Sequence, residues 1–173
     1  GPGHPVTSTL SRPAGLPSAA ATADRPRPLA TWEFEGDLKD SLGNLHGKAF
    51  GHARVGQGAL VVDGIDSYVQ TVPLQKDLTA KTLEAWVLLD NLSQRGGAAI
   101  SVETRDGGTF DAIVFGEREP RRWMSGSNGF ARTQSFQGSE ETQAVEQPVH
   151  VAIVYQTDGT IIGYRNGVQY GQP

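Results

Sequence analysis

The sequence contains no cysteine among its 173 residues. Disulfide bridges, thiolate nucleophiles and cysteine-ligated zinc sites are therefore excluded, although this absence does not define a cellular compartment. No apolar run approaches the roughly 20 residues that span a bilayer, and the N-terminus lacks a charged start followed by an apolar run. We therefore expect no membrane insertion and no signal peptide in this chain.

Basic clusters are also lacking. The chain has 15 Lys and Arg residues against 19 Asp and Glu, a net charge of −4, and no group of basic residues interleaved with aromatics. A protein that binds nucleic acid needs a surface that neutralises phosphates. The sequence therefore excludes nucleic acid as an expected partner.

Glycine and proline are abundant, at 22 and 10 residues, which indicates many turns and few long helices. Residues 1–28 are rich in Pro, Ala and Ser and have no apolar period, so we expect a linker or tag-derived tail without fixed structure. The remaining residues, 29–173, are enough for one domain with a hydrophobic core.

Short segments rich in β-branched and aromatic residues recur from residue 29 onward, each bounded by Gly, Asn or Asp. This pattern predicts an all-β protein. The expected strands are 31–35, 59–63, 68–72, 82–89, 98–103, 110–115, 122–125, 149–155 and 160–165. Nine strands suit a sandwich of two sheets.

Two of these strands are apolar on both faces, which predicts central positions in a sheet. Residues 82–89 and 149–155 show this pattern, and we expect Trp86 and Ile153 to lie in the core. The dipeptides at 158–159 (Asp-Gly) and 166–167 (Asn-Gly) favour tight hairpins. They predict a meander of 149–155, 160–165 and 168–170.

Four motifs occur in a familiar order: TWEFEGDLKDSLGNLHGKAFG (31–51), GALVVDGIDSYVQT (58–71), KTLEAWVLLDNL (81–92) and HVAIVYQTDGTIIGYRNGV (150–168). Together they resemble the laminin-G-like domains of the concanavalin A-like lectin and glucanase superfamily. The resemblance implies an antiparallel β-sandwich of the jelly-roll type. It is nearest to modules of large exported bacterial proteins, which implies an extracytoplasmic location: periplasmic, cell surface or secreted.

Members of that family continue with further strands after the Asn-Gly hairpin, whereas this chain stops at Pro173. The resemblance therefore implies a sandwich that lacks its C-terminal strands. The sheet edge beside 31–35 would be left open. Another chain or domain is expected to cover it.

Calcium is the metal that the resemblance implies, because loop carboxylates and carbonyls hold it in this superfamily. Asp37 and Asp40 form one candidate pair, and Asp63 and Asp66 form a second. Neither pair has the spacing of a dedicated calcium loop. Acidic side chains in turns also cap backbone N–H groups without any ion, so both interpretations stay open.

An exposed aromatic side chain flanked by polar groups is typical of carbohydrate sites. One stretch has this composition, and its candidate ligand-binding residues are Arg121, Arg122, Trp123, Asn128 and Phe130. The alternative is that Trp123 and Met124 pack in the core while the arginines pair with Glu117 and Glu119.

No catalytic group stands out. Glycoside hydrolases use two carboxylates set on one face, and only Glu33, Glu35 and Asp37 alternate in the required way. No Ser, His and Asp arrangement can be nominated, and His150 is expected to be buried and bonded to backbone.

The sequence therefore predicts a non-catalytic, lectin-like recognition module that binds a glycan or a neighbouring protein domain. The first alternative is a structural spacer in a larger exported protein. A glycoside hydrolase is the last alternative. No cofactor is expected apart from the calcium ion considered above.

Overall fold

The computed structural model describes residues 27–173. The expected linker over residues 1–28 lies outside the described residues except for its last two positions. The chain divides between Gln75 and Lys76 into two compact units, which we call unit 1 and unit 2 and consider separately. Within the described range, no helix is long and apolar enough to cross a membrane.

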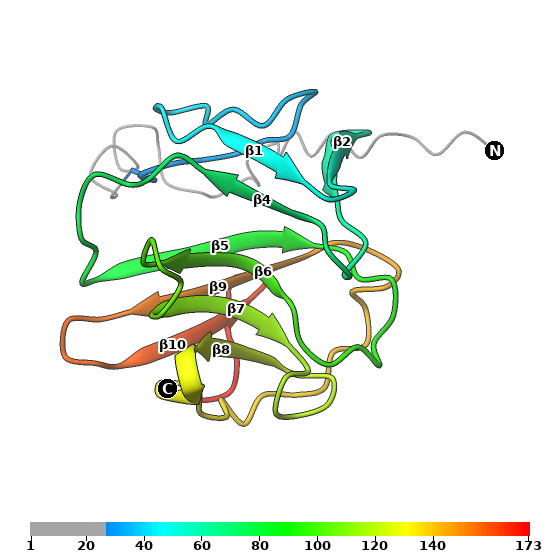
Figure 1. The fold of residues 1–173 in the computed structure, drawn as a ribbon. Helices are drawn as coiled ribbons and strands as arrows, with labels where there is room; N and C mark the ends of the chain where they lie inside the picture. Colours follow the sequence, from blue (N-terminus) through cyan, green and yellow to red (C-terminus); the bar gives the residue numbers. More distant parts are fainter. Residues whose placement is uncertain (1–26) are drawn as a thin grey trace, which may run out of the picture. The chain divides into compact units, whose positions relative to one another are not determined.

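Unit 1 contains two small antiparallel sheets of two strands each (Figure 1). In one, β1 (Gly47–Phe50) pairs with β4 (Tyr68–Thr71), and in the other, β2 (Arg54–Gly56) pairs with β3 (Ala59–Val61). The strands predicted at 59–63 and 68–72 are thus confirmed with shorter ends. The sequence does not predict β1 and β2, because their glycines are typical of turns.

Residues 31–35 do not form the expected strand. A single antiparallel bridge joins Trp32 to Asp40, and Phe34 has a φ of 56°, which lies outside the extended region. Side chains point to alternate faces only where the backbone stays extended. The residues on either side of Phe34 therefore do not share a strand face.

Unit 2 contains a four-stranded antiparallel sheet in the order β11, β10, β9, β5. Its strands are β5 (Lys81–Val87), β9 (Val149–Tyr155), β10 (Ile161–Arg165) and β11 (Val168–Gln169). The predicted meander at the C-terminal end is confirmed. Asn166 has a φ of 49° in the second hairpin, as a turn residue with positive φ should.

A second sheet in unit 2 has three antiparallel strands in the order β6, β7, β8. They are β6 (Ala98–Glu103), β7 (Phe110–Phe115) and β8 (Trp123–Ser127). A single 3-10 turn, η1 (Asn128–Phe130), follows β8. The predicted bounds of β6 and β7 are confirmed. β8 begins one residue later and ends two residues later than the predicted strand 122–125.

The two sheets of unit 2 enclose one apolar core, and Figure 1 shows them as two layers. One sheet contributes Leu83, Val151 and Ile153, and the other contributes Ile113, Phe115 and Trp123, all at most 4% exposed. Burying each large apolar side chain contributes about 1.5–3 kcal/mol. The predicted all-β, two-sheet antiparallel sandwich is confirmed.

A buried carboxylate lies beside this core. Glu141 is 2% exposed, and its oxygens accept hydrogen bonds from the Trp123 indole at 2.9 Å and from the Arg165 guanidinium at 2.7 and 2.9 Å. The backbone N–H groups of Gln143 and Ala144 also donate to it. Because every partner is a donor, the carboxylate is stable only when it is ionised.

The prediction that Trp86 lies in the core is wrong. Its side chain is 57% exposed, whereas Ile153 is fully buried as expected. The four-stranded sheet has its core residues, such as Leu83 and Ile153, on one face, and Trp86 pairs with His150 on the opposite face. β5 is also an edge strand and not the central strand that was predicted. Only one face of β5 covers the core, and Trp86 is on the other.

Candidate functional site

The outward face of the four-stranded sheet carries an exposed tryptophan among polar side chains. We call this surface the Trp86 face. Its residues alternate with the core residues Leu83, Val151 and Ile153 along the same strands. It consists of Thr82, Glu84 and Trp86 from β5, His150, Ala152 and Val154 from β9, and Ile162 and Tyr164 from β10.

The strand register brings the polar members of this face together. Trp86 lies directly opposite His150, and Glu84 lies opposite Ala152, which in turn faces Tyr164 of β10. Cross-strand neighbours of this kind have Cβ atoms about 4.5–5.5 Å apart. Residues more than 60 positions apart in the chain therefore form one continuous surface.

An aromatic pair and a weak ion pair define the geometry of this face. The Trp86 and His150 rings lie 5.2 Å apart between centroids at an interplanar angle of 58°. His150 Nε2 is 3.7 Å from an oxygen of Glu84, whose side chain is 59% exposed. The expectation that His150 is a buried residue bonded to backbone is wrong, since its ring contacts these two side chains.

Two of the five predicted ligand-binding residues have internal roles. Trp123 is 2% exposed and bonds to Glu141, so it offers no aromatic platform, and the alternative core interpretation is the correct one for this residue. Asn128 accepts hydrogen bonds from the Phe110 N–H and from Arg132. The hydrogen bonds of these two side chains are made within the protein, and those of Asn128 stabilise the turn after β8.

The other three positions of that stretch stay nearer to solvent. Arg122 donates to the carbonyls of Gly138 and Pro120, at 3.1 and 3.2 Å, and is half-buried. Arg121 is exposed, and Phe130 is 44% exposed with the Arg118 guanidinium 4.5 Å from its ring centroid. Ligand binding by Arg121 and Phe130 stays a prediction.

The Asp40 carboxylate is buried and serves the turn that follows it. It accepts hydrogen bonds from the backbone N–H groups of Thr31, Leu42 and Leu45 at 3.0 to 3.2 Å. Burial alone would raise the pKa of Asp40, but these backbone donors lower it below the ordinary value. Asp37 likewise accepts from the Lys39 N–H at 3.0 Å. Both side chains thus cap backbone N–H groups of their turn, and calcium binding by them stays a prediction.

A shallow depression of about 260 Å³ adjoins this turn and is lined by Glu33, Glu35 and Asp37 among others. The hydrolase interpretation required the two glutamates to share one strand face. Because no strand forms there, that premise is wrong. Catalysis by these carboxylates has no geometric support.

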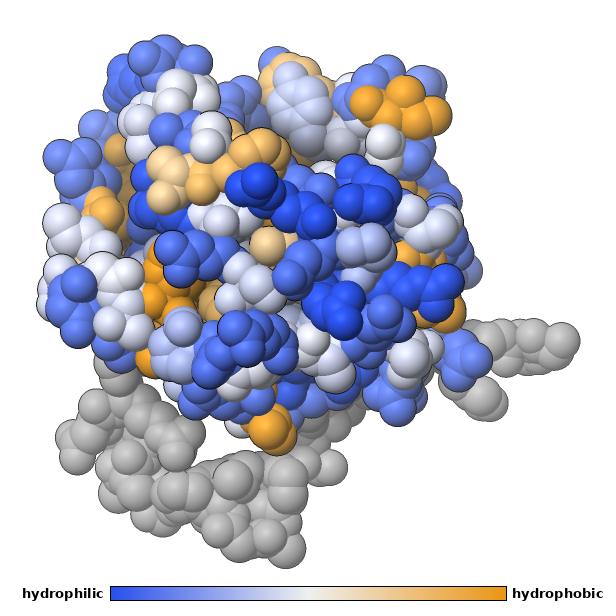
Figure 2. Space-filling model, turned by 90° about the horizontal axis from the view of Figure 1, so that it is seen from below, coloured by the Kyte–Doolittle hydropathy of each residue, from blue (hydrophilic) through white to orange (hydrophobic). Residues whose placement is uncertain are grey.

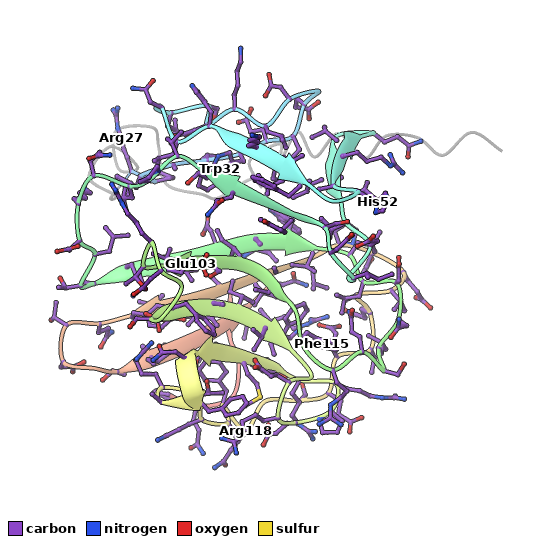
Figure 3. The ribbon with its side chains drawn as sticks, viewed as in Figure 1. Arg27, Trp32, His52, Glu103, Phe115 and Arg118 are labelled. Carbon is purple, nitrogen blue, oxygen red and sulfur yellow. The ribbon has the colours of Figure 1, made fainter. Side chains whose placement is uncertain are left out.

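The second predicted metal pair is joined by a histidine that the sequence analysis did not connect with it. One donor atom each from His52, Asp63 and Asp66 lie within 4.8 Å of one another at the surface of unit 1. His52 Nδ1 is 3.4 Å from an oxygen of each aspartate. Figure 3 shows His52 beside the start of β2.

The face that sequence analysis missed had a recognisable signal. In the segment KTLEAWV the even positions carry Thr82, Glu84 and Trp86, a set with a charged residue in its middle. A charged side chain in mid-strand indicates a solvated face. If the charge of Glu84 is taken as a better indicator of the face than the size of Trp86, the sequence predicts an exposed tryptophan.

The comparisons with known proteins identify a family over part of the chain. The model of the laminin-G-type family described as the concanavalin A-like lectin/glucanases superfamily matches residues 63–173. Neither the search of curated proteins nor the search of solved structures returns a match. The matched range includes all of unit 2 and therefore the Trp86 face.

Proposed function

The chain belongs to the concanavalin A-like lectin/glucanases superfamily, and we propose that it is a non-catalytic recognition module that binds a glycan on the Trp86 face. The observation that carries this proposal is the exposed indole of Trp86 on a sheet surface, with Glu84 and His150 beside it. Family membership alone would not select a ligand, because this fold serves many functions.

The chemistry of this face matches that of a sugar. The exposed part of an indole offers a flat apolar surface that packs against the C–H groups of a pyranose ring. The exposed carboxylate of Glu84 accepts hydrogen bonds from hydroxyl groups, and His150 can donate or accept. Tyr164 extends the aromatic surface two strands away, at about 10 Å in the direction of strand pairing.

The same face argues against hydrolysis. Glycoside hydrolases place a second carboxylate about 5–9.5 Å from the first. Glu84 is the one carboxylate in strands β5, β9, β10 and β11. A surface with a single carboxylate supports binding without cleavage.

A direct test compares the chain with two aromatic variants on a glycan array, followed by calorimetric titration of any bound sugar. Trp86→Ala should lower the affinity about 30-fold or more, as expected for removal of a central aromatic contact. Phe130→Ala is the matched control, because Phe130 is also an exposed aromatic residue but lies on the stretch predicted from sequence.

The two variants separate the possible sites. Loss of binding in Phe130→Ala with full binding in Trp86→Ala would move the site to the Arg121 and Phe130 stretch. The Trp86 face would be rejected as a binding site if no glycan on the array bound and if Trp86→Ala captured a neighbouring domain as well as the native chain does. That result would favour the structural spacer.

Two further expectations are carried by the resemblance. An extracytoplasmic location agrees with a module that meets glycans, and protease access at the surface of intact cells tests it. The open sheet edge was expected beside residues 31–35, where no strand forms. Binding of another chain stays a proposal, which the mass of the purified protein in solution would test.

A further inference from the structure

Three side chains of the types that ligate metals converge at one end of the β1–β4 ladder in unit 1. β1 ends at Phe50, which pairs with Tyr68 at the start of β4, so the residues just beyond these ends lie close together. His52 follows β1 by two positions, and Asp66 precedes β4 by two. The turn before Asp66 returns Asp63 to the same place, where its Oδ2 lies 3.4 Å from His52 Nδ1.

The backbone geometry allows this approach only with glycine at position 51. Gly51 has a φ of +63°, and a Cβ atom there would lie 2.4 Å from the carbonyl oxygen of Asp66. Any larger residue would push the two segments apart. The close backbone contact at Gly51 thus holds His52 next to Asp66. The backbone N–H of His52 also donates a hydrogen bond to Ser67 Oγ at 3.1 Å.

The two oxygens of Asp63 have different roles. Oδ1 accepts hydrogen bonds from the backbone N–H groups of Ile65 and Asp66, at 2.9 and 3.3 Å, and so fixes the turn. Oδ2 faces His52 Nδ1.

Two carboxylate oxygens therefore face one imidazole nitrogen. His52 Nδ1 lies 3.4 Å from Asp63 Oδ2 and 3.4 Å from Asp66 Oδ1. A single proton on Nδ1 can form one good hydrogen bond but not two, and without that proton three lone pairs converge. A cation bound between the three atoms would satisfy all of them.

We propose that His52, Asp63 and Asp66 form a surface site for Zn²⁺ or a similar divalent transition-metal ion. The two separations of 3.4 Å from His52 Nδ1 suit such an ion, because bonds of about 2.0–2.1 Å at tetrahedral angles place neighbouring donors about 3.3 Å apart. The donor types select it, since imidazole favours zinc, copper and nickel, whereas calcium and magnesium take oxygen ligands. Water completes the coordination on the solvent side, where the His52 side chain is 80% exposed.

The proposal differs from the calcium expectation in its dependence on His52. An oxygen-only ion at Asp63 and Asp66 would bind as well without the imidazole. Variants at position 52 therefore distinguish the two. They should fold, because the His52 side chain is 80% exposed and its ring forms no hydrogen bond or ion pair with the described residues other than those to the two aspartates.

The experiment titrates the full chain, without a polyhistidine tag, with ZnCl₂ and separately with CaCl₂ by calorimetry. One zinc ion should bind per chain. His52→Ala and Asp66→Ala should each weaken zinc binding at least ~10-fold. Losses of this size follow when residues that hydrogen-bond to metal ligands are changed, so removal of a ligand itself should cost at least as much. His46→Ala is the matched control, an exposed histidine of the same unit, and should leave zinc binding unchanged.

Any of three results would overturn the proposal: no zinc binding by the native chain, zinc binding that His52→Ala leaves unchanged, or calcium binding at the aspartates that persists in His52→Ala while zinc fails to bind. Circular dichroism of each variant confirms that the β-fold is retained, so that a lost titration signal reports on the site.

Discussion

Lys81 Nζ lies 2.7 Å from the Oδ2 atom of Asp111 and joins the two sheets of unit 2 at one end of the sandwich. Both side chains are largely buried, at 12% and 14% exposed, and Arg132 approaches the other oxygen of Asp111 at 2.8 Å. Burial alone would raise the pKa of Asp111, but the bonds from Lys81 and Arg132 lower it. The carboxylate is therefore the common partner of two cations.

That arrangement predicts an asymmetry between the two partners. Asp111→Ala leaves two cations without their anion and should lower the free energy of unfolding by roughly 3–5 kcal/mol, whereas Lys81→Met leaves the pair of Asp111 and Arg132 in place and should cost less. Urea unfolding at pH 7 measures both. Equal losses in the two variants would show that Arg132 does not share the carboxylate.

Glu141 predicts a dependence of stability on pH. Burial would raise the pKa of this carboxyl, but donors led by Arg165 lower it to about 2, from 4.5 in the unfolded chain. Because the folded-state pKa is lowered, ionised Glu141 stabilises the fold fully above about pH 4.5. This stabilisation, about 3 kcal/mol in full, is lost as the pH falls towards 2. The stability difference between the native chain and Glu141→Gln should be constant above pH 5 and shrink below it. A difference independent of pH down to 2.5 would contradict this.

Tyr155 predicts a stabilising substitution. Its hydroxyl group is buried and has no hydrogen-bond partner within the described residues. Burial raises the pKa of this phenol, which agrees with an apolar setting. Because an unsatisfied buried hydroxyl costs about 1–3 kcal/mol, Tyr155→Phe should raise the melting temperature. The ring would still lie below Lys81 Nζ, now 4.4 Å from its centroid, so a lower melting temperature would imply an unseen partner for the hydroxyl.

The two tryptophans of unit 2 predict opposite effects on stability. Trp123 is buried and bonded to Glu141, so Trp123→Ala should lower the free energy of unfolding by about 3–5 kcal/mol. Trp86 is 57% exposed, so Trp86→Ala should change it by about 1 kcal/mol or less. Chemical denaturation of both variants tests this. A large loss in Trp86→Ala would mean that the Trp86 face is covered in the protein.

The fold was largely predictable from local signals, and the errors have local causes. Several strands were predicted at their observed bounds, namely 98–103, 110–115 and 149–155. In each, a run rich in β-branched or aromatic residues is ended by turn residues, which define where the strand begins and ends. The failure at 31–35 arises from the positive φ of Phe34, which no propensity of phenylalanine indicates.

The site was less predictable, because it depends on pairings distant in sequence. Whether Trp86 or Trp123 is exposed is decided by which face of its sheet covers the core, and that depends on how the two sheets pack, which the composition of a single strand does not reveal. His52 joins Asp63 only through the pairing of β1 with β4. Figure 2 shows a face of mainly hydrophilic side chains with small scattered hydrophobic groups, so hydropathy alone would not have singled out a binding surface on it.

The Tyr170 hydroxyl accepts a hydrogen bond from the Trp123 N–H and donates to the Ser139 carbonyl, and its ring packs edge-on against Phe136. During translation, β7 and β8 leave the ribosome well before this residue does. Their core side then has neither the tyrosine nor the strand β9 to cover it. Unit 2 must therefore acquire its native packing late in synthesis, and a nascent chain stalled before position 170 should be bound by chaperones and cut readily by proteases.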